Sequence, residues 1–386
     1  MEMASLGIPD LEDRDHCIQT LSLSDIRNKV EDLKMSLLTT NDNLFTGFGI
    51  KDIKCGGNHT LVLLENGVLL GAGDLKELSN NSCNVADGWI ILNHEIYKKV
   101  KEEHIGFDFN NYHISSVSSC WDSSFVTLKS RNDSLYTFVL SFGNQSKGEL
   151  GRKQEARNFT IFEALNVKDI QLHACLYTNV MQVAYNNGDT EIYGWGSNSK
   201  GQLLKIETKA DKQLETPKLL HTFMQNQQIE CHIGKDFLVI CDYKNDNVVT
   251  TGNKKIVDSL NAMSISLADV DHVDTMWSSV HYNKNGVILG FGNDQLGQLC
   301  MNNKTLPPAK FLKCGSEHMI YVSKKEPHIV KSWGWGEHGN CGAFTGDREV
   351  NKQLVFYEPN KIYETKREEE IVDIYGGCAT TFILIS

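Results

Sequence analysis

One short stretch of the chain gathers side chains that could hold a metal ion. The segment SWGWGEHGNCG places Glu337, His338 and Cys341 within five positions. Carboxylate, imidazole and thiolate groups are the protein ligands of zinc, and Cys314 and His318 could join them from a neighbouring strand. A zinc site needs three or four convergent ligands, whereas the His-x-x-Cys spacing alone supplies two. The sequence therefore favours a structural or interface role for this stretch and predicts no metal site in the chain.

Histidines in similar segments could instead serve as general acids or bases. His59, His281 and His318 stand at similar places in segments that resemble one another. A catalytic histidine needs a nucleophile and an orienting carboxylate, and no Ser-His-Asp arrangement is legible. The segment with Gly194 and Gly196 lacks the GKS or GKT ending and the strand–loop–helix context of a phosphate-binding loop. We expect histidines that hydrogen-bond between repeats, a repeat turn at these glycines, and no catalytic or cofactor-binding residues, so the protein is predicted not to be an enzyme.

Composition restricts the function further. The 386 residues carry 38 Lys and Arg against 49 Asp and Glu, a net charge of −11, without any basic run. Nonspecific DNA binding needs clustered positive charge, so direct DNA binding is not expected. The 11 cysteines include no Cys-x-x-Cys pair, which argues against a disulfide framework and favours reduced thiols. No secretory signal and no membrane-length apolar run occur, so we expect a soluble protein of the cytoplasm and nucleus without membrane contact.

A repeated pattern runs along the chain. Its first half is a glycine-rich or small-residue segment followed by an apolar strand, as in CGGNHTLVLL and CGSEHMIYV. The seven copies begin at Cys55, Ser119, His173, Ile233, Thr275, Cys314 and Gly376, on average about 54 residues apart. Such a repeat indicates one supersecondary unit per copy, and each unit is stable only when neighbouring copies cover its faces.

The second half of the pattern predicts a β-hairpin. Turns such as ENG at 65–67, NNGD at 186–189 and NKNG at 283–286 lead into a strand that ends in an aromatic or small residue and glycine. Asn-Gly turns supply the positive φ of a tight hairpin, and the terminal glycine permits close backbone approach. About four strands repeated in seven copies fit a closed ring, whereas a straight β-solenoid normally has shorter and more regular repeats. We therefore predict an all-β fold, a seven-bladed β-propeller.

The two chain ends raise the question of how the ring closes. The last copy ends at Ser386 without a hairpin, so the segment LFTGFG at 44–49 should supply an N-terminal strand to the same sheet. We expect residues 44–386 to form the propeller and residues 1–43 an extension that is partly helical or disordered. Within the extension, SDIRNKVEDLKMSLL at 24–38 has a serine cap and apolar residues at helical spacing. This extension either covers a sheet edge or is an artefact of the gene model.

The paired motifs CGGNHTLVLLENGVL and YGWGSNSKGQL resemble the repeats of the regulator of chromosome condensation family. The resemblance covers about residues 44–386 and implies a seven-bladed β-propeller. Further strings, among them GKDF, MWSS, CGSEH and WGWGEHGNCG, are similar to one fungal branch of the family rather than to the generic repeat. The N-terminal extension and the absence of the usual polar turn after residue 49 depart from the family pattern.

The resemblance implies a non-catalytic scaffold. In that fungal branch the propeller forms a heterodimer with a small zinc-binding, electron-carrying protein of diphthamide synthesis, and the zinc belongs to that partner. The pair supports Elongator-dependent modification of wobble uridines in tRNA and diphthamide formation on elongation factor two, which makes the Elongator complex a second expected partner. The alternative is guanine-nucleotide exchange on a small GTPase, an activity of the wider family. Those exchange factors carry a protruding β-wedge and a basic tail, and neither is apparent in this acidic chain.

Partner contacts are expected at the turn that precedes the apolar strand of each repeat. Such turns reach one face of a propeller, and aromatic residues beside polar ones at a rim suit a protein–protein hot spot. By contrast, Trp195 and Trp333 are expected to pack between blades. The sequence leaves open which face is occupied and whether the scaffold regulates its partner or only stabilises it. The residues predicted to bind the partner are Asn58, Trp121, Asp122, Lys235, Asp236, Trp277, Glu317, His318, Trp335, Glu337 and His338.

Overall fold

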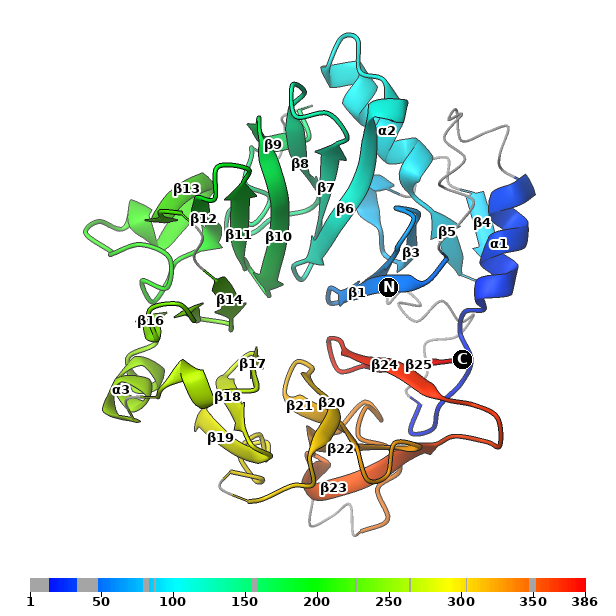
Figure 1. Cartoon of the computed structure of the whole chain (residues 1–386), viewed down its shortest axis with the longest axis vertical. Coiled ribbons are helices and arrows are strands. Elements are labelled where there is room, and N and C mark those ends of the chain that lie inside the picture. The colour runs from blue at the N-terminus through cyan, green and yellow to red at the C-terminus, as the bar shows by residue number, and fades with distance from the viewer. Residues whose placement is uncertain are drawn as a thin grey trace. The chain divides into compact units, whose positions relative to one another are not determined.

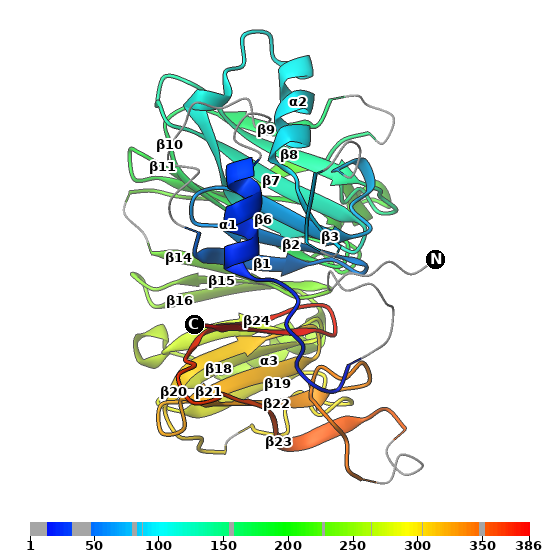
Figure 2. The same cartoon turned by 90° about the vertical axis from the view of Figure 1, so that its right-hand side faces the viewer.

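The computed structural model of the protein describes residues 14–32, 48–78, 83–86, 88–153, 158–225, 228–263, 265–302, 304–346 and 352–386. The chain divides into two compact units. Unit 1 includes Gln19–Ser199 and Leu203–Gln227, and unit 2 includes Glu12–Ile18, Lys200–Gln202 and Gln228–Ser386. Figures 1 and 2 show the ribbon from two directions. Within the described ranges, no helix has the length and apolar character needed to cross a membrane.

The described part of unit 1 holds three antiparallel sheets and two α-helices. The first sheet has the order β1-β2-β3-β5-β4, with bounds Ile50–Cys55, His59–Leu64, Leu69–Gly73, Trp89–Ile91 and Cys83–Ala86. The second runs β6-β7-β8-β9, with bounds Tyr112–Ser119, Ser123–Ser130, Thr137–Gly143 and Thr160–Ala164. The third runs β10-β11-β12-β13, with bounds Val167–Cys175, Thr178–Tyr185, Thr190–Ser197 and Gln213–Phe223. The helices are α1 (Leu23–Asp32) and α2 (Asn93–Glu103).

The described part of unit 2 holds four antiparallel sheets and helix α3 (Lys254–Met263). Strands β14-β15-β16 span Ile229–Ile233, Phe237–Asp242 and Asn247–Gly252. Strands β17-β18-β19 span His272–Thr275, Ser279–Lys284 and Val287–Gly292. Strands β20-β21-β22-β23 span Ala309–Cys314, His318–Ser323, Ile329–Trp335 and Val355–Glu364, and β24-β25 span Ile371–Gly376 and Thr381–Ile385.

The second strand of each sheet is the apolar half of the repeat. The seven copies form β2, β7, β11, β15, β18, β21 and β25. Every residue of β2, β15 and β21 is buried, because these strands are covered on both faces, and such strands read as continuous apolar runs. The hairpin turns predicted at 65–67, 186–189 and 283–286 join β2 to β3, β11 to β12 and β18 to β19. Each turn contains a glycine of positive φ, at Gly67, Gly188 and Gly286, as the motifs predicted.

The fold is an all-β propeller with six blades, and the prediction of seven is not confirmed. Six sheets have three to five strands, whereas β24 and β25 form a sheet of two. The segment at 44–49 was expected to complete that last sheet and close the ring. Its residues 44–47 lie outside the described part, Phe48 and Gly49 form no strand, and the chain directly enters β1 at Ile50. Among the described strands, none joins the β24–β25 pair.

One of the helices was predicted and the other two were not. The helix expected at 24–38 is confirmed as α1, and residues 33–38 lie outside the described part. Ile26 of α1 is fully buried, and the indole N–H of Trp89 donates to the Thr20 carbonyl oxygen at 3.0 Å just before the helix. Helix α2 follows β5 and buries Ile96 and Val100 in the core of the first two sheets. Helix α3 follows β16, at a place where the repeat pattern gives no helical signal.

Candidate protein-binding surface at the first turns

Seven of the eleven predicted partner-binding residues lie in a turn that recurs in six sheets. We call it the first turn and define it as the two residues that directly precede the second strand of a sheet. In unit 1 the first turns are Gly57–Asn58, Trp121–Asp122 and Leu176–Tyr177. In unit 2 they are Lys235–Asp236, Trp277–Ser278 and Ser316–Glu317.

Backbone hydrogen bonds join consecutive first turns within each unit. In unit 1 the Gly57 N–H donates to the Trp121 carbonyl oxygen at 2.8 Å, and the Trp121 N–H donates to Leu176 at 2.8 Å. In unit 2 the Lys235 N–H donates to the Trp277 carbonyl oxygen at 2.7 Å, and the Trp277 N–H donates to Ser316 at 2.8 Å. Each unit therefore presents a continuous row of three first turns whose spacing is set by the backbone rather than by side chains.

The second residue of every first turn is held through its carbonyl group. A glycine near the end of the third strand has a φ between 88° and 126°, and the next residue donates its N–H to this carbonyl over 2.7–3.0 Å. The six glycines are Gly73, Gly143, Gly196, Gly252, Gly292 and Gly334. A Cβ atom at Gly143, Gly252 or Gly292 would lie 2.3 Å from the carbonyl oxygen. The glycine that ends the third strand thus lets the backbone pack directly against the first turn, because a side chain at this glycine would displace the turn.

In unit 1 the row carries two aromatic side chains. Trp121 packs over the neighbouring turn, because a Cβ atom at Gly57 would lie 2.6 Å from its indole ring. Trp121, Asp122 and Asn58 are all half-buried. Tyr177 occupies the place that corresponds to Asp122, and the Lys147 ammonium lies 4.2 Å from its ring centroid. Sequence reasoning omitted Tyr177, although its copy of the repeat had been recognised and the alignment of the copies would have found it.

In unit 2 the row is joined by side chains as well as backbone. The Ser278 hydroxyl donates to the Glu317 carboxylate at 3.0 Å, and the Gln298 amide donates to the same oxygen at 2.8 Å. Burial raises the pKa of Glu317, although these hydrogen bonds and the nearby Lys235 act in the opposite direction. Glu317 is only 6% exposed, so it serves mainly to fix the turn. Lys235 is exposed, and Trp277 and Asp236 are half-buried.

The stretch EHGN extends the row of unit 2. The Trp335 N–H donates to the Glu317 carbonyl oxygen at 2.9 Å, which places Trp335 directly beside the first turn. The indole N–H of Trp335 donates to the Glu337 carboxylate at 3.1 Å, and the His338 ring meets the indole edge-on at 5.1 Å between centroids. Glu337 and His338 are exposed. The structure therefore brings Trp335, Glu337 and His338 together beside Glu317.

The N-terminal segment of unit 2 lies against the same stretch. Gly339 has a φ of +84°, and a Cβ atom there would lie 2.0 Å from the Arg14 carbonyl oxygen. Further along, the Cys17 thiol donates to the Ile362 carbonyl oxygen at 3.6 Å. Residues 14–17 thus border the Glu337–His338 turn, and part of the predicted extension is ordered on unit 2.

The three histidines considered for acid–base chemistry are buried. Burial lowers the pKa of His59, His281 and His318 to about 4, so each ring is neutral at pH 7. His59 shares a hydrogen bond with Ser124 of the next sheet at 3.0 Å, and His318 shares one with Thr381 of the next sheet at 3.1 Å. These two bonds confirm the predicted role between repeats, whereas His281 bonds to Ser279 in its own strand at 2.9 Å.

His318 requires a correction as a predicted partner contact. Its side chain is 0% exposed and lies between β21 and β25. A ring in this position cannot reach a protein docked on the surface. The side chains that remain available in unit 2 are those of Lys235, Asp236, Trp277, Trp335, Glu337 and His338.

Burial of His318 predicts a loss of stability in acid. The unfolded imidazole titrates near pH 6.5, whereas the folded one has a pKa of about 4. Between these values only the unfolded chain binds the proton, so the free energy of unfolding falls as the pH drops, by about 1.4 kcal/mol per pH unit for each such histidine. We expect His318→Phe, which copies Phe237 of the fourth repeat, to remove one such contribution. Urea unfolding at a series of pH values measures the slope, and an unchanged slope would contradict neutral burial.

The side chains of the segment SWGWGEHGNCG that could bind zinc do not converge on one point. Cys341 is 0% exposed, its thiol donates to the Trp335 carbonyl oxygen at 3.4 Å, and Ser332 donates to its sulfur at 3.3 Å. Burial raises the pKa of Cys341 to about 12, which keeps it a thiol, whereas zinc binds the thiolate. Over the described ranges, no group of three or more His, Cys, Asp and Glu side chains is arranged to hold a metal ion.

Comparisons with known proteins agree with this fold. Residues 50–83 match the family pattern described as regulator of chromosome condensation (RCC1) repeat. An RCC1 repeat-containing protein of Schizosaccharomyces pombe is 24% identical over 348 residues, which cover 87% of this chain and 90% of that protein.

Two solved structures resemble the chain in fold. Yeast RCC1 (Prp20), crystallised with Kap60 bound, matches with a TM-score of 0.62 and 14% identity over 87% of this chain and 80% of that one. Human WBSCR16 matches with a TM-score of 0.56 and 15% identity over 88% of each chain. Together with the sheets and first turns described above, these matches indicate a β-propeller fold similar to that of RCC1, and residues 50–83 match one regulator of chromosome condensation repeat.

Proposed function

We propose that the protein is a non-catalytic scaffold that binds another protein through its first turns. The observation that carries this proposal is the backbone-bonded row of Lys235–Asp236, Trp277–Ser278 and Ser316–Glu317, flanked by Trp335. A rigid row that offers aromatic side chains among charged ones suits an interface, because aromatic anchors lose little conformational entropy on binding. The three histidines first considered for acid–base chemistry, His59, His281 and His318, are buried and neutral, which also supports a binding role.

The partner proposed for this surface is a small zinc-binding, electron-carrying protein of diphthamide synthesis. This step rests on the strings GKDF, MWSS, CGSEH and WGWGEHGNCG, which resemble the fungal alpha-tubulin suppressor, a killer-toxin-insensitivity protein. The heterodimer would act in the cytoplasm and nucleus. It would support Elongator-dependent modification of wobble uridines in tRNA and diphthamide formation on elongation factor two. These four of the strings that carry the resemblance fall in unit 2, at its first turns or beside Trp335, whereas GWGSNSKGQL and GGCATTFIL lie elsewhere, so the resemblance coincides with the surface in part.

Guanine-nucleotide exchange on a small GTPase is the second candidate. It is supported by the fold shared with yeast RCC1 (Prp20), at a TM-score of 0.62. Against it, the net charge of −11 and the lack of a basic run differ from the basic tail of the exchange factors that the repeats resemble. A nucleotide-release assay with the nuclear GTPase separates the two candidates, because a scaffold for the zinc protein leaves the release rate unchanged.

Trp277→Ala tests the proposed surface. A central aromatic anchor typically contributes at least about 2 kcal/mol, so we expect affinity for the zinc protein to fall by at least about 30-fold in isothermal titration. The matched control is Tyr357→Ala, which removes an aromatic residue that is 58% exposed on β23 and outside the first turns. If the two variants bound with equal affinity and circular dichroism showed both to be folded, the first turns of unit 2 would not be part of the interface.

A further inference from the structure

Unit 1 carries a group of cations without acidic partners. Lys51 lies on β1, Lys129 on β7 with Arg131 just after it, and Lys168 on β10. We call these four residues the basic cluster. None of them forms an ion pair with a carboxylate in the described part of the chain, although the whole chain has a net charge of −11. Three of these charges, those of Lys51, Lys129 and Arg131, act on the same ring of His113, and the Lys129 ammonium reaches the backbone of Lys168.

The strand register places the basic cluster away from the first turns. Lys51 sits at a β-bulge between Ile50, which pairs with Leu64, and Asp52, which pairs with Leu63. Lys168 sits at the corresponding bulge of β10, next to Val167. Both bulges oppose the far end of the second strand, whereas the first turn precedes its beginning. Binding at the basic cluster is thus separate from binding at the proposed surface.

Backbone carbonyl groups fix two of the ammonium groups. The Lys51 ammonium donates to the Ser115 carbonyl oxygen of the next sheet at 2.7 Å, and the Lys129 ammonium donates to the Lys168 carbonyl oxygen. An ammonium group has three N–H donors, so each keeps two after this bond. The Ser115 hydroxyl is also buried and has no hydrogen-bond partner in the described part of the chain. The charges of Lys51 and Lys129 are thus held in place with unused donors, which lowers the entropy lost on binding an anion.

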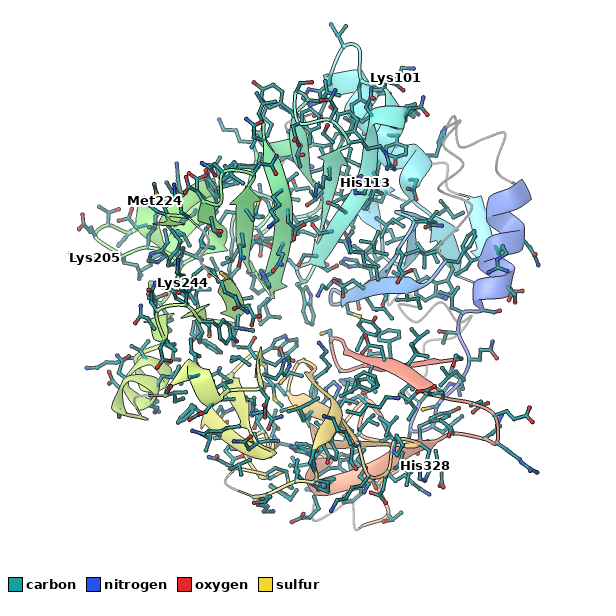
Figure 3. The ribbon with its side chains drawn as sticks, viewed as in Figure 1. Lys101, His113, Lys205, Met224, Lys244 and His328 are labelled. Carbon is teal, nitrogen blue, oxygen red and sulfur yellow. The ribbon has the colours of Figure 1, made fainter. Side chains whose placement is uncertain are left out.

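The pKa of His113 indicates the sign of the electrostatic potential beside the basic cluster. This residue pairs with Lys129 across β6 and β7, and Figure 3 shows where it lies on the ribbon. Burial, with the charges of Arg131, Lys129 and Lys51 acting in the same direction, lowers the pKa of His113 to about 4. No carboxylate acts on this ring in the opposite direction. Three members of the basic cluster therefore act together on one ring without an opposing carboxylate.

Unit 2 contains the same lysine contact in a compensated form. Lys310 occupies the bulge of β20 and donates to the Ile371 carbonyl oxygen at 2.8 Å, as Lys51 does to Ser115. It also pairs with the Glu370 carboxylate at 2.9 Å. A lysine that hydrogen-bonds to the backbone of the next sheet can thus also form an ion pair with a carboxylate. Within the described residues, Lys51 and Lys129 have no such carboxylate, so their remaining N–H donors are available to an external anion.

We propose that the basic cluster binds a carboxylate-rich peptide segment of a protein partner. A short acidic segment meets only the local positive charge, whereas a nucleic acid strand would extend over a surface that repels it. Exposed carboxylates would accept hydrogen bonds from the ammonium groups already fixed at Ser115 and Lys168. Tyr136 follows Arg131 in the same hairpin and is 45% exposed, so a nucleic acid that stacks on it is the competing outcome.

Fluorescence anisotropy with a labelled oligoglutamate peptide tests the basic cluster. The variant carries Lys51→Gln, Lys129→Gln and Lys168→Gln together. The matched control carries Lys205→Gln, Lys304→Gln and Lys310→Gln, which changes the net charge equally at lysines paired with Glu207, Glu358 and Glu370. We expect salt-dependent binding by the wild-type chain, at least about tenfold weaker binding by the cluster variant, and little change in the control.

Two outcomes would overturn the inference. Equal losses in the cluster variant and the control would mean that net charge alone governs peptide binding. Tighter binding of a uridine oligonucleotide than of the peptide of equal charge would assign the cluster to nucleic acid. Urea unfolding of both triple variants shows whether lost carbonyl contacts have unfolded unit 1, and in that case Arg131→Gln alone, at an exposed residue, repeats the comparison.

Discussion

Gly196→Ala is expected to lower the free energy of unfolding of unit 1 by at least about 3 kcal/mol. Gly196 has a φ of +91°, and a Cβ atom there would lie 2.2 Å from the Tyr177 carbonyl oxygen. That oxygen accepts the Ser197 N–H at 2.7 Å. Left-handed backbone strain costs about 1–3 kcal/mol, and displacing the carbonyl adds a lost hydrogen bond and overpacking beside the buried Trp195.

A second glycine of unit 1 isolates the steric part of this effect. Gly106 has a φ of +85°, but no heavy atom lies within 4 Å of the Cβ position. Gly106→Ala should therefore show only the backbone strain, about 1 kcal/mol. Urea unfolding followed by tryptophan fluorescence measures both variants. If the two variants differed by less than about 1 kcal/mol, the contact between the third-strand glycine and the first turn would not support the fold as described.

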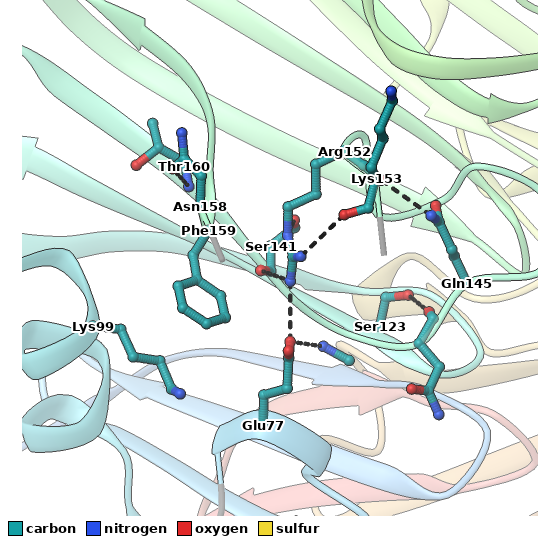
Figure 4. Close-up of polar contacts among 12 residues, drawn as sticks. Glu77, Lys99, Ser123, Ser141, Gln145, Arg152, Lys153, Asn158, Phe159 and Thr160 are labelled. Atoms are coloured by element: carbon teal, nitrogen blue, oxygen red, sulfur yellow. Dashed lines mark hydrogen bonds and ion pairs between the residues drawn. The ribbon is translucent and has the colours of Figure 1, made fainter. Parts of the chain in front are cut away.

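Arg152→Ala is expected to cost about 3 kcal/mol of unfolding free energy. Arg152 is 6% exposed, and its guanidinium donates to the Glu77 carboxylate at 3.0 Å and to the Ser141 hydroxyl at 3.1 Å (Figure 4). The group also lies 5.0 Å from the centroid of the Phe159 ring. Removing one partner of a buried ion pair costs about 3–5 kcal/mol, and the partial exposure of Glu77 places this case at the lower end.

Two variants check the origin of this cost. Arg152→Lys keeps the charge but cannot bridge Glu77 and Ser141 together, so about half of the loss should remain. Arg131→Ala truncates an exposed arginine of the same unit, and we expect a change within about 0.5 kcal/mol. Thermal and urea unfolding of the three variants should rank them in that order. Equal stability of Arg152→Ala and wild type would show that the network of Figure 4 carries no net stabilisation.

The repeat made the second strands and hairpin turns predictable. Buried strands such as β2 and β21 are continuous apolar runs in the sequence, and Asn-Gly pairs indicate a turn with positive φ. Both features can therefore be predicted from a short stretch of sequence. The prediction of seven blades, which is not confirmed, assumed that each second strand brings a complete sheet. Whether a strand such as β25 acquires further partners depends on segments distant in the chain, which local periodicity does not encode. Helices α2 and α3 interrupt the pattern and carried no repeat signal.

The candidate surface was predictable in position but not in exposure. Alignment of the repeats placed Trp121, Lys235 and Trp277 in equivalent turns, and the backbone bonds confirm that the turns within each unit are neighbours. Sequence alone could not show that His318 points between sheets, because the residue after a turn can face either side of a strand. The hydrogen bond to Thr381, a residue 63 positions later, decides its orientation.

The basic cluster escaped sequence reasoning for a related reason. Its lysines stand far apart in the chain and belong to three sheets, so no basic run marks them. Only the β-bulges of β1 and β10 bring Lys51 and Lys168 to corresponding strand ends. Within the described residues these cations have no carboxylate partner, a feature that only the fold reveals, whereas composition pointed to an acidic surface throughout.

Native mass spectrometry of the full chain mixed with the small zinc-binding protein of diphthamide synthesis tests the scaffold proposal most directly. The account predicts a one-to-one complex with zinc retained, and its loss in Trp277→Ala but not in Tyr357→Ala. Two uncomplexed species at micromolar concentration, together with accelerated nucleotide release from the nuclear GTPase, would contradict it and favour the exchange-factor alternative.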